Sequence, residues 1–238
     1  MFSANDNMIM KKFVVAIDGT AASGKSTTAR GVAKALGFFY LDTGAMYRAV
    51  TYKIIQEKLD IKDIPALKEL LNRTTIEFRK SNDNKNLISL DNNDVTRQIR
   101  MHEVDAMVSP VSAIPEIREK MVEEQHRIAQ DKNIVVEGRD IGSVVFPDAD
   151  IKFYLDCSMD QRALRRGKEL HRKGDEISSQ SIKDNLVRRD QIDSNRQTSP
   201  LKQMPDAIYL DTTNLTINEE IQFVVDAVKN KIAIQNIK

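Results

Sequence analysis

A glycine-rich segment near the start of the chain, residues 19–26, has the glycine, lysine and serine spacing of a P-loop. Gly19 and Gly24 allow the backbone to curl around a phosphate with its N–H groups pointing inward, and the N-terminus of a following helix adds positive potential. Lys25 can reach the β- and γ-phosphates, and Ser26 offers a hydroxyl to Mg²⁺. The segment therefore predicts a site for a nucleoside triphosphate with magnesium. The residues expected to bind the triphosphate are Gly19, Thr20, Ala21, Ala22, Ser23, Gly24, Lys25, Ser26 and Thr27.

The segments on either side of this loop support the interpretation. Residues 13–17 are apolar and largely β-branched, which predicts a buried strand. Residues 27–36 suit a helix, because Ala29, Val32 and Leu36 fall on one face. A strand, a glycine-rich turn and a helix in this order are the context that a P-loop requires, and they make a chance turn the weaker interpretation.

A second polar segment, residues 42–48, lies where a short predicted strand meets a predicted helix. Asp42 or Thr43 can cap that helix, which is a structural role. Tyr47 and Arg48 follow one turn further along, where the guanidinium of Arg48 could reach the phosphate of an acceptor. The segment therefore has a structural interpretation for its first half and a binding interpretation for its second.

Arg139 and Asp140 directly follow an apolar run, residues 134–137, that predicts another buried strand. A charged pair at such a position is costly unless the two groups are paired or lie in a solvated cleft. An arginine there can hold phosphate through two hydrogen bonds, and an aspartate can orient Mg²⁺ or the attacking oxygen. The pair predicts a phosphate-handling site at the end of this strand.

Two further segments are rich in charge. Residues 160–173 form a predicted helix, and one face of it carries Arg162, Arg165, Arg166 and Arg172. A solvated surface is the simplest interpretation of a charged helix, but arginines close behind a strand end of a P-loop protein favour a lid that covers phosphates. Residues 188–196 alternate cations with carboxylates, and a surface ladder of ion pairs and a functional site are equally compatible with that pattern.

The hydrophobic pattern alternates strands with helices, which predicts a parallel sheet covered by helices on both faces. We expect an α/β P-loop fold of three layers with a five-stranded parallel sheet, a small antiparallel β insertion and a helical lid. The predicted strands are 13–17, 38–41, 134–137, 151–155 and 207–210, and the predicted helices include 45–59 and 218–232. The expected division is a discontinuous kinase core (11–71, 101–157 and 190–238), an insertion (72–100), a lid (158–189) and a disordered tail (1–10).

Composition excludes several classes of protein. The 238 residues include 36 basic and 35 acidic ones, so no strong field favours nucleic acid or a membrane surface as a partner. One cysteine, Cys157, excludes an internal disulfide framework and suits a reducing compartment. No apolar run approaches the ~20 residues that cross a bilayer, and residues 1–10 lack the apolar core of a secretory signal. We therefore expect a cytoplasmic protein.

The polar segments, in their order and spacing, resemble those of the bacterial cytidylate kinase family, P-loop nucleoside monophosphate kinases that phosphorylate CMP and dCMP with ATP. The resemblance runs from about residue 12 to about residue 230. Its marks are residues 17–26, 41–48, 138–147, 189–190 with 193–196, and 199–201. Ser143 stands where the family more often has threonine, and Gly167 where it often has a bulky residue.

The resemblance implies a role for each matching position. Arg118 and Arg139 would hold the acceptor phosphate, Asp140 would face the amino group of the pyrimidine, and Asp193 would bind the sugar hydroxyls. The implied CMP site is Asp42, Thr43, Tyr47, Arg48, Arg118, Arg139, Asp140, Arg189, Asp193 and Arg196. The implied catalytic residues are Lys25, Arg139, Asp140, Arg162 and Arg166. The cofactor would be Mg²⁺ with ATP as co-substrate, and we expect a monomer that binds neither nucleic acid nor membrane.

Two alternatives remain open at this stage. The chain could be another P-loop kinase of small molecules, acting on UMP, AMP or shikimate, although the segments on the acceptor side favour CMP. It could instead be a nucleotide switch or regulatory binding module without an acceptor. A switch of the GTPase type needs an asparagine-lysine-x-aspartate motif to read guanine, and the sequence has none after a suitable strand.

Overall fold

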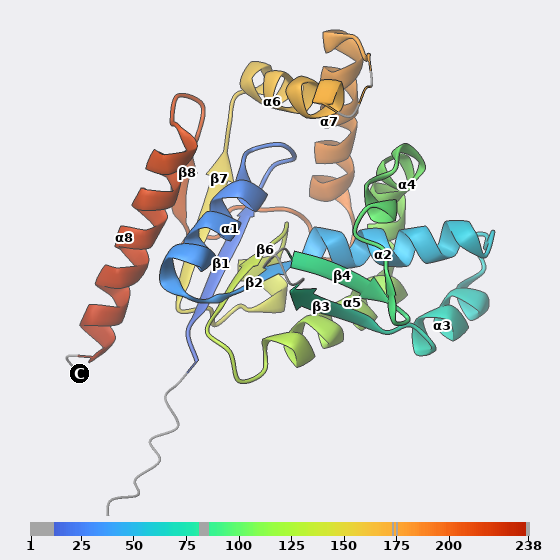
Figure 1. Ribbon diagram of the computed structural model, residues 1–238, viewed down its shortest axis with the longest axis horizontal. Coiled ribbons are helices and arrows are strands. Elements are labelled where there is room, and N and C mark those ends of the chain that lie inside the picture. The colour runs from blue at the N-terminus through green and yellow to red at the C-terminus, as the bar shows by residue number, and fades with distance from the viewer. Residues whose placement is uncertain (1–11, 81–85, 173, 175, 237–238) are drawn as a thin grey trace, which may run out of the picture.

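A five-stranded parallel sheet forms the centre of the molecule (Figure 1). The computed structural model describes residues 12–80, 86–172, 174 and 176–236, and the expected tail, residues 1–10, lies outside them. The spatial order of the strands is β2-β6-β1-β7-β8, and all neighbours pair in parallel. The predicted sheet is thereby confirmed. The strands are β1 (Val14–Gly19), β2 (Phe39–Asp42), β6 (Ile134–Glu137), β7 (Ile151–Asp156) and β8 (Ile208–Asp211).

Helices cover both faces of this sheet, because side chains alternate between the faces along each buried strand. On β1, Val15 and Ile17 pack against helices α1 (Lys25–Leu36) and α8 (Ile217–Asn236). Ala16 between them faces the opposite cluster. That second cluster contains residues of α2 (Thr43–Gln56), α3 (Ile64–Asn72), α4 (His102–Ser112) and α5 (Pro115–Ala129). The predicted three layers are confirmed.

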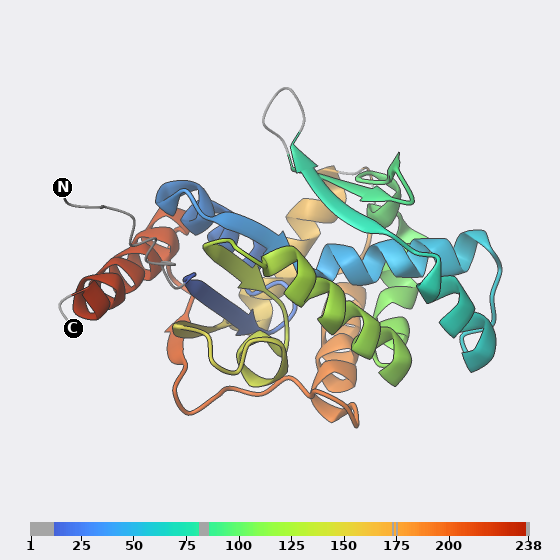
Figure 2. The same cartoon turned by 90° about the horizontal axis from the view of Figure 1, so that it is seen from below.

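A small antiparallel sheet interrupts the alternation, as predicted. Its strands are β3 (Ile76–Lys80), β4 (Asn86–Leu90) and β5 (Asn93–Asp94), followed by the 3-10 turn η1 (Gln98–Arg100). Ile76, Ile88 and Leu90 of this sheet are buried in the cluster beside α2 and α5. Most of the asparagine-rich turn between β3 and β4 lies outside the described residues. Figure 2 shows this sheet along the edge of the molecule near α2, with α8 and α3 at opposite ends.

The helices α6 (Met159–Arg172) and α7 (Ser179–Asn195) form the predicted helical lid and stand beside the P-loop at the top of Figure 1. Ala163 and Leu170 of α6 pack against Ile182 and Leu186 of α7, and Ala21 of the P-loop belongs to the same cluster. The two helices are therefore held against the P-loop by apolar contact. The predicted boundaries between core, insertion and lid stay predictions.

Some helix boundaries differ from expectation. The helix after β2 begins at Thr43, because the Asp42 side chain caps it by accepting the N–H of Ala45 at 2.8 Å. It ends at Gln56 instead of residue 59, since Lys58 takes a left-handed conformation with φ of 52°. Sequence patterns also did not predict α3, α4 and α5, or the short π-helix η2 (Ile141–Val145). Among the described residues, no helix combines the length and the apolar character needed to cross a membrane.

Replacing Gly167 with alanine is expected to raise the free energy of unfolding by about 1 kcal/mol, because glycine is costly inside a helix. A Cβ on Gly167 would lie 3.5 Å from Ile182 Cδ1, which is an ordinary contact. Gly31 in α1 is the matched control, since its Cβ would lie 2.2 Å from Ile221 Cδ1. Denaturant melts should show a gain for Gly167→Ala and a loss for Gly31→Ala. A loss for both would contradict the prediction.

Candidate active site

The P-loop leaves β1 through a backbone that only glycine tolerates. Gly19 has φ of 148°, and a Cβ there would lie 1.9 Å from the carbonyl oxygen of Leu155. Gly24, the N-cap of α1, has φ of 101°. Lys25 begins α1 and is buried, and its Nζ donates to the carbonyl of Thr20 at 2.5 Å. Burial, together with the nearby charge of Arg139, lowers the pKa of the Lys25 ammonium.

Ser26 and Glu137 form an oxygen-rich corner beside this lysine. The Ser26 hydroxyl donates to Glu137 Oε2 at 2.8 Å, and the Tyr40 hydroxyl donates to the other carboxylate oxygen. Glu137 is the last residue of β6 and is buried. Burial and the neighbouring Asp42 raise the pKa of Glu137. A serine hydroxyl and a carboxylate are groups that Mg²⁺ prefers, so these two side chains fit a magnesium ion on the triphosphate.

Asp18 connects the P-loop strand to the segment after β6. Its carboxylate accepts the backbone N–H groups of Ile141 and Gly142, each at 2.8 Å. Burial raises the pKa of Asp18 to about 6, although the two N–H groups oppose this. Because Arg139 and Asp140 directly precede the bonded amides, Asp18 fixes their backbone relative to the P-loop.

Charged residues from three segments meet on the other side of the site. Asp140 pairs with Arg118 of α5 and with Arg196 at 3.4 Å, and all three are buried. Arg139 Nε donates to Asp193 of α7 at 2.8 Å. The buried guanidinium of Arg118 also lies 5.5 Å from the centroid of the Tyr47 ring. The fold thereby brings together several residues of the predicted CMP site that lie far apart in the sequence.

The first half of the segment 42–48 has a clear structural role. Asp42 caps α2 and also pairs with Arg100 at 2.9 Å. The Thr43 hydroxyl donates to the backbone carbonyl of Glu137 at 2.7 Å. Both residues also line a cavity at the carboxyl ends of the central strands, so the structural interpretation does not exclude contact with a ligand.

Asp105 of α4 lies within ion-pair distance of three arginines. Arg48 of α2 donates to Asp105 Oδ1 at 2.5 Å, and Arg166 of α6 donates to Oδ2. Arg189 of α7 lies 3.9 Å from Oδ1. Burial alone would raise the pKa of Asp105, but Arg48 and Arg166 outweigh it and hold this pKa well below its usual range. A single carboxylate therefore connects three elements around the site.

The arginines on one face of α6 contact two different parts of the site: Arg162 and Arg165 contact the P-loop, and Arg166 contacts Asp105. Arg162 points beneath the P-loop, where it pairs with Asp190 at 2.5 Å and donates to the carbonyl of Ala21 at 3.1 Å. Arg165 donates to the Ser23 carbonyl at 3.0 Å and pairs with buried Glu220. Arg166 alone of these three extends to Asp105. The expected catalytic role of Arg162 and Arg166 stays a prediction.

Removing the charge of Arg162 should have a different effect from removing the charge of Arg166. Arg162→Gln is expected to cost about 3 kcal/mol of folding stability, because it breaks a buried ion pair under the P-loop. Arg166→Gln should lower the melting temperature less, because Asp105 keeps Arg48 as a partner, and should lower kcat by about 100-fold, because its guanidinium lines the cavity. Thermal melts and steady-state kinetics on both variants check this. A wild-type kcat for Arg166→Gln would contradict a role for this side chain in the reaction.

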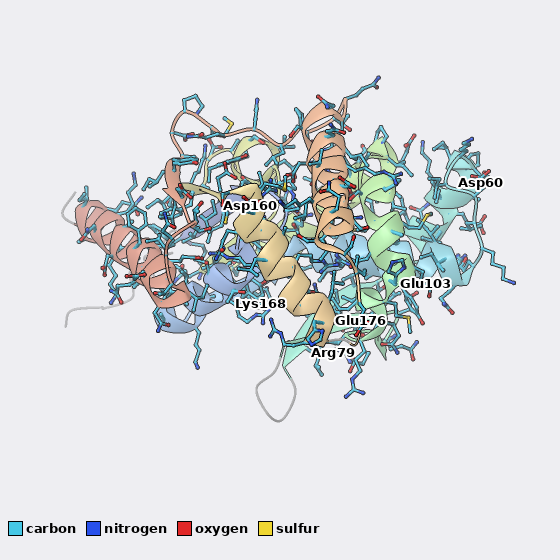
Figure 3. The ribbon with its side chains drawn as sticks, turned by 90° about the horizontal axis from the view of Figure 1, so that it is seen from above. Asp60, Arg79, Glu103, Asp160, Lys168 and Glu176 are labelled. Atoms are coloured by element: carbon cyan, nitrogen blue, oxygen red, sulfur yellow. The ribbon has the colours of Figure 1, made fainter. Side chains whose placement is uncertain are left out.

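A cavity of about 840 Å³ lies between these groups at the carboxyl ends of the strands. On one side it is lined by the P-loop and on the other by the charged set around Asp140. Lys168 of α6, labelled in Figure 3, lines the same cavity. The predicted site residues that do not line it are Gly19, Thr20 and Arg162.

Comparison with known proteins decides the family. The sequence model of cytidylate kinase matches residues 15–230. The chain belongs to the cytidylate kinase family. It is 49% identical over 213 residues to the cytidylate kinase of Streptococcus pneumoniae (strain 70585), covering 90% of this chain and 96% of that one. The cytidylate kinase of S. pneumoniae (strain Hungary19A-6) gives the same identity and coverage. The predicted family and enzyme class are confirmed.

A solved structure supports the fold of this cytidylate kinase family member. It is an uncharacterized protein from Eubacterium ventriosum ATCC 27560, with a TM-score of 0.52 and 11% sequence identity. The match covers 92% of this chain and 99% of that one. At this identity the likeness bears on the fold alone.

Some charged residues of this cytidylate kinase family member were not predicted to be part of the site. They are Asp18, Arg100, Asp105, Glu137 and Glu220. Glu137 carried a usable signal, because it is an acidic residue at the end of a buried strand. Asp105 carried none, since an aspartate on a helix is ordinarily a surface residue.

Proposed function

We propose that the protein transfers the γ-phosphate of ATP to CMP or dCMP, giving ADP and CDP or dCDP, as a cytoplasmic monomer in pyrimidine nucleotide metabolism. The observation that supports this most is that one cavity has a P-loop on one side and a buried arginine–aspartate set on the other. Two phosphate groups would meet between these sides. For a chain of the cytidylate kinase family, such a cavity suits transfer of a phosphoryl group from ATP to CMP or dCMP.

On the donor side, the P-loop amides and Lys25 would hold the triphosphate. Ser26 and Glu137 would hold Mg²⁺, which supplies positive charge to the phosphates when bound. The Lys25 ammonium now donates to the Thr20 carbonyl and would exchange this partner for phosphate oxygens. A buried ammonium gains more from an anion than an exposed one does, because the local dielectric constant is low.

On the acceptor side, Arg48, Arg118 and Arg139 would hold the phosphate of CMP. Buried donors remain for this purpose, since Nε of Arg118 and Nε of Arg189 have no hydrogen-bond partner among the described residues. The carboxylate of Asp140 would accept a hydrogen bond from the amino group of cytosine, and that of Asp193 would accept hydrogen bonds from the sugar hydroxyls. Cytosine is thereby distinguished from uracil, whose carbonyl at that position repels a carboxylate.

In the reaction, an oxygen of the CMP phosphate attacks the γ-phosphorus, and the bond from that phosphorus to the bridging oxygen of ADP breaks. The attacking oxygen is already ionised near neutral pH, so no strong general base is required. The protein contributes position and positive charge through Lys25 and the arginines. Closure of α6 and α7 would exclude water and so limit wasteful hydrolysis of ATP.

Turnover with a panel of acceptors tests the proposal. ADP formation is followed by a coupled assay with CMP, dCMP, UMP, AMP, GMP, dTMP and shikimate offered separately. Turnover with CMP and dCMP far above the others is the expected result. Turnover with a different acceptor alone would overturn the specificity, and ATP binding without any stimulated turnover would favour a switch or binding module.

A further inference from the structure

Three cationic side chains from three different helices lie around Asp105 on the wall of the cavity. Arg48 belongs to α2 on the acceptor side, whereas Arg166 and Arg189 belong to the two lid helices. Guanidinium groups this close repel one another, and the effect is visible at Arg189. Burial, together with the charges of Arg48 and Arg139, lowers the pKa of Arg189 to about 10. A shared counter-ion is therefore needed to keep the three groups together.

Asp105 supplies that counter-ion through both of its oxygens. Oδ1 accepts from Arg48 and Oδ2 accepts from Arg166, so one carboxylate spans the cavity wall between the acceptor side and the lid. The side chain of Asp105 is 15% exposed, and those of Arg48 and Arg166 are 11% and 15% exposed. Ion pairs shielded from water to this extent restrict side-chain rotation far more than surface pairs do.

We propose that Asp105 is a positioning residue for phosphoryl transfer, whose carboxylate holds Arg48 of the acceptor side and Arg166 of the lid in register. The proposal rests on the proposed function for the identity of the reaction. Asp105 acts through the two arginines and touches no substrate. When substrates bind, Arg48 and Arg166 would exchange part of their hydrogen bonding with Asp105 for bonds to phosphate. Because Asp105 already holds both guanidinium groups in place, little further ordering would be needed.

The first test is a double-mutant cycle of Asp105→Asn and Arg166→Gln, read as kcat and as KM for CMP and ATP. Asp105→Asn should lower kcat by about 10-fold or more and change KM for ATP by less than about 2-fold, because its contacts lie away from the P-loop. In the Arg166→Gln background, Asp105→Asn should lower kcat by a smaller factor, because only Arg48 is left for the carboxylate to position. Effects that multiply, or wild-type kcat in Asp105→Asn, would overturn the proposal.

The matched control is Glu103→Gln, the same change on the same helix at an exposed side chain labelled in Figure 3. It should leave kcat and the melting temperature unchanged. If Asp105→Asn does not fold, Asp105→Glu takes its place in the cycle, because it keeps the charge and displaces the carboxylate by one methylene. Asp105→Glu should then lower kcat in the wild-type background and lower it by a smaller factor in the Arg166→Gln background; equal factors, or no effect in the wild-type background, contradict the proposal.

A second readout does not depend on the reaction. Protein labelled with ¹⁵N-arginine, without nucleotides, is compared by NMR as wild type, Asp105→Asn and Glu103→Gln, with signals assigned from Arg48→Lys and Arg166→Lys. Guanidinium rotation of both arginines should be slow in the wild type and in Glu103→Gln, and faster in Asp105→Asn. Equal rotation in all three proteins would overturn the positioning role. Failure of the proposed function would instead appear as a wild type inactive with CMP, with this result unchanged.

Discussion

Replacing Lys25 with alanine is expected to lower kcat by about 10³-fold, equivalent to about 4 kcal/mol of activation free energy. The ammonium of Lys25 lies buried at the mouth of the P-loop, within bonding distance of the Thr20 carbonyl and beside Ser23. Lys25 is the only cationic side chain in residues 19–27, so no other side chain of the loop could replace its charge beside the phosphates. The fold should persist, because removing a buried ammonium relieves its own cost of burial.

The control for this prediction is Lys34→Ala, a change of the same type in the last turn of the same helix at an exposed position. It should leave kcat within about 2-fold of the wild type. Circular dichroism and thermal melts establish that both variants are folded. A rate close to wild type for Lys25→Ala would refute the assigned role of this residue.

Replacing Asp140 with alanine is expected to raise KM for CMP by about 100-fold, equivalent to about 3 kcal/mol, while KM for ATP changes far less. Asp140 holds Arg118 and Arg196 by ion pairs in a buried part of the acceptor side. Its removal leaves two buried guanidinium groups facing each other and removes the proposed acceptor for cytosine. We also expect a loss of about 3–5 kcal/mol in folding stability.

Three comparisons give this prediction a sharp outcome. Asp148→Ala changes an exposed aspartate just after the same segment and should affect neither KM nor stability. Asp140→Asn keeps the shape of the side chain and isolates the effect of charge. The ratio of kcat/KM for CMP over UMP should fall in both Asp140 variants. Equal increases in KM for CMP and for ATP would argue against a role in selecting the base.

Local features of the sequence predicted the parts of the molecule that depend on short-range physics. The P-loop was predictable because its glycines and its lysine act within one turn of backbone, and β6 begins and ends at the predicted residues. The helices α3, α4 and α5 were not predicted. Prolines at residues 65, 110 and 115 look like helix breakers, yet Pro65 is the second residue of its helix and Pro115 the first, and proline is accepted in the first turn of a helix.

The sequence by itself determined the family, the parallel sheet, the P-loop and about half of the residues around the central cavity, because motif spacing and apolar periodicity are properties of the chain alone. Tertiary structure decided which carboxylate pairs with which arginine. Asp105 joins Arg48, Arg166 and Arg189, and Glu137 reaches Ser26, across long separations in sequence. Charge pairing depends on distance and burial, and both are set only when the sheet, the lid and α4 pack together.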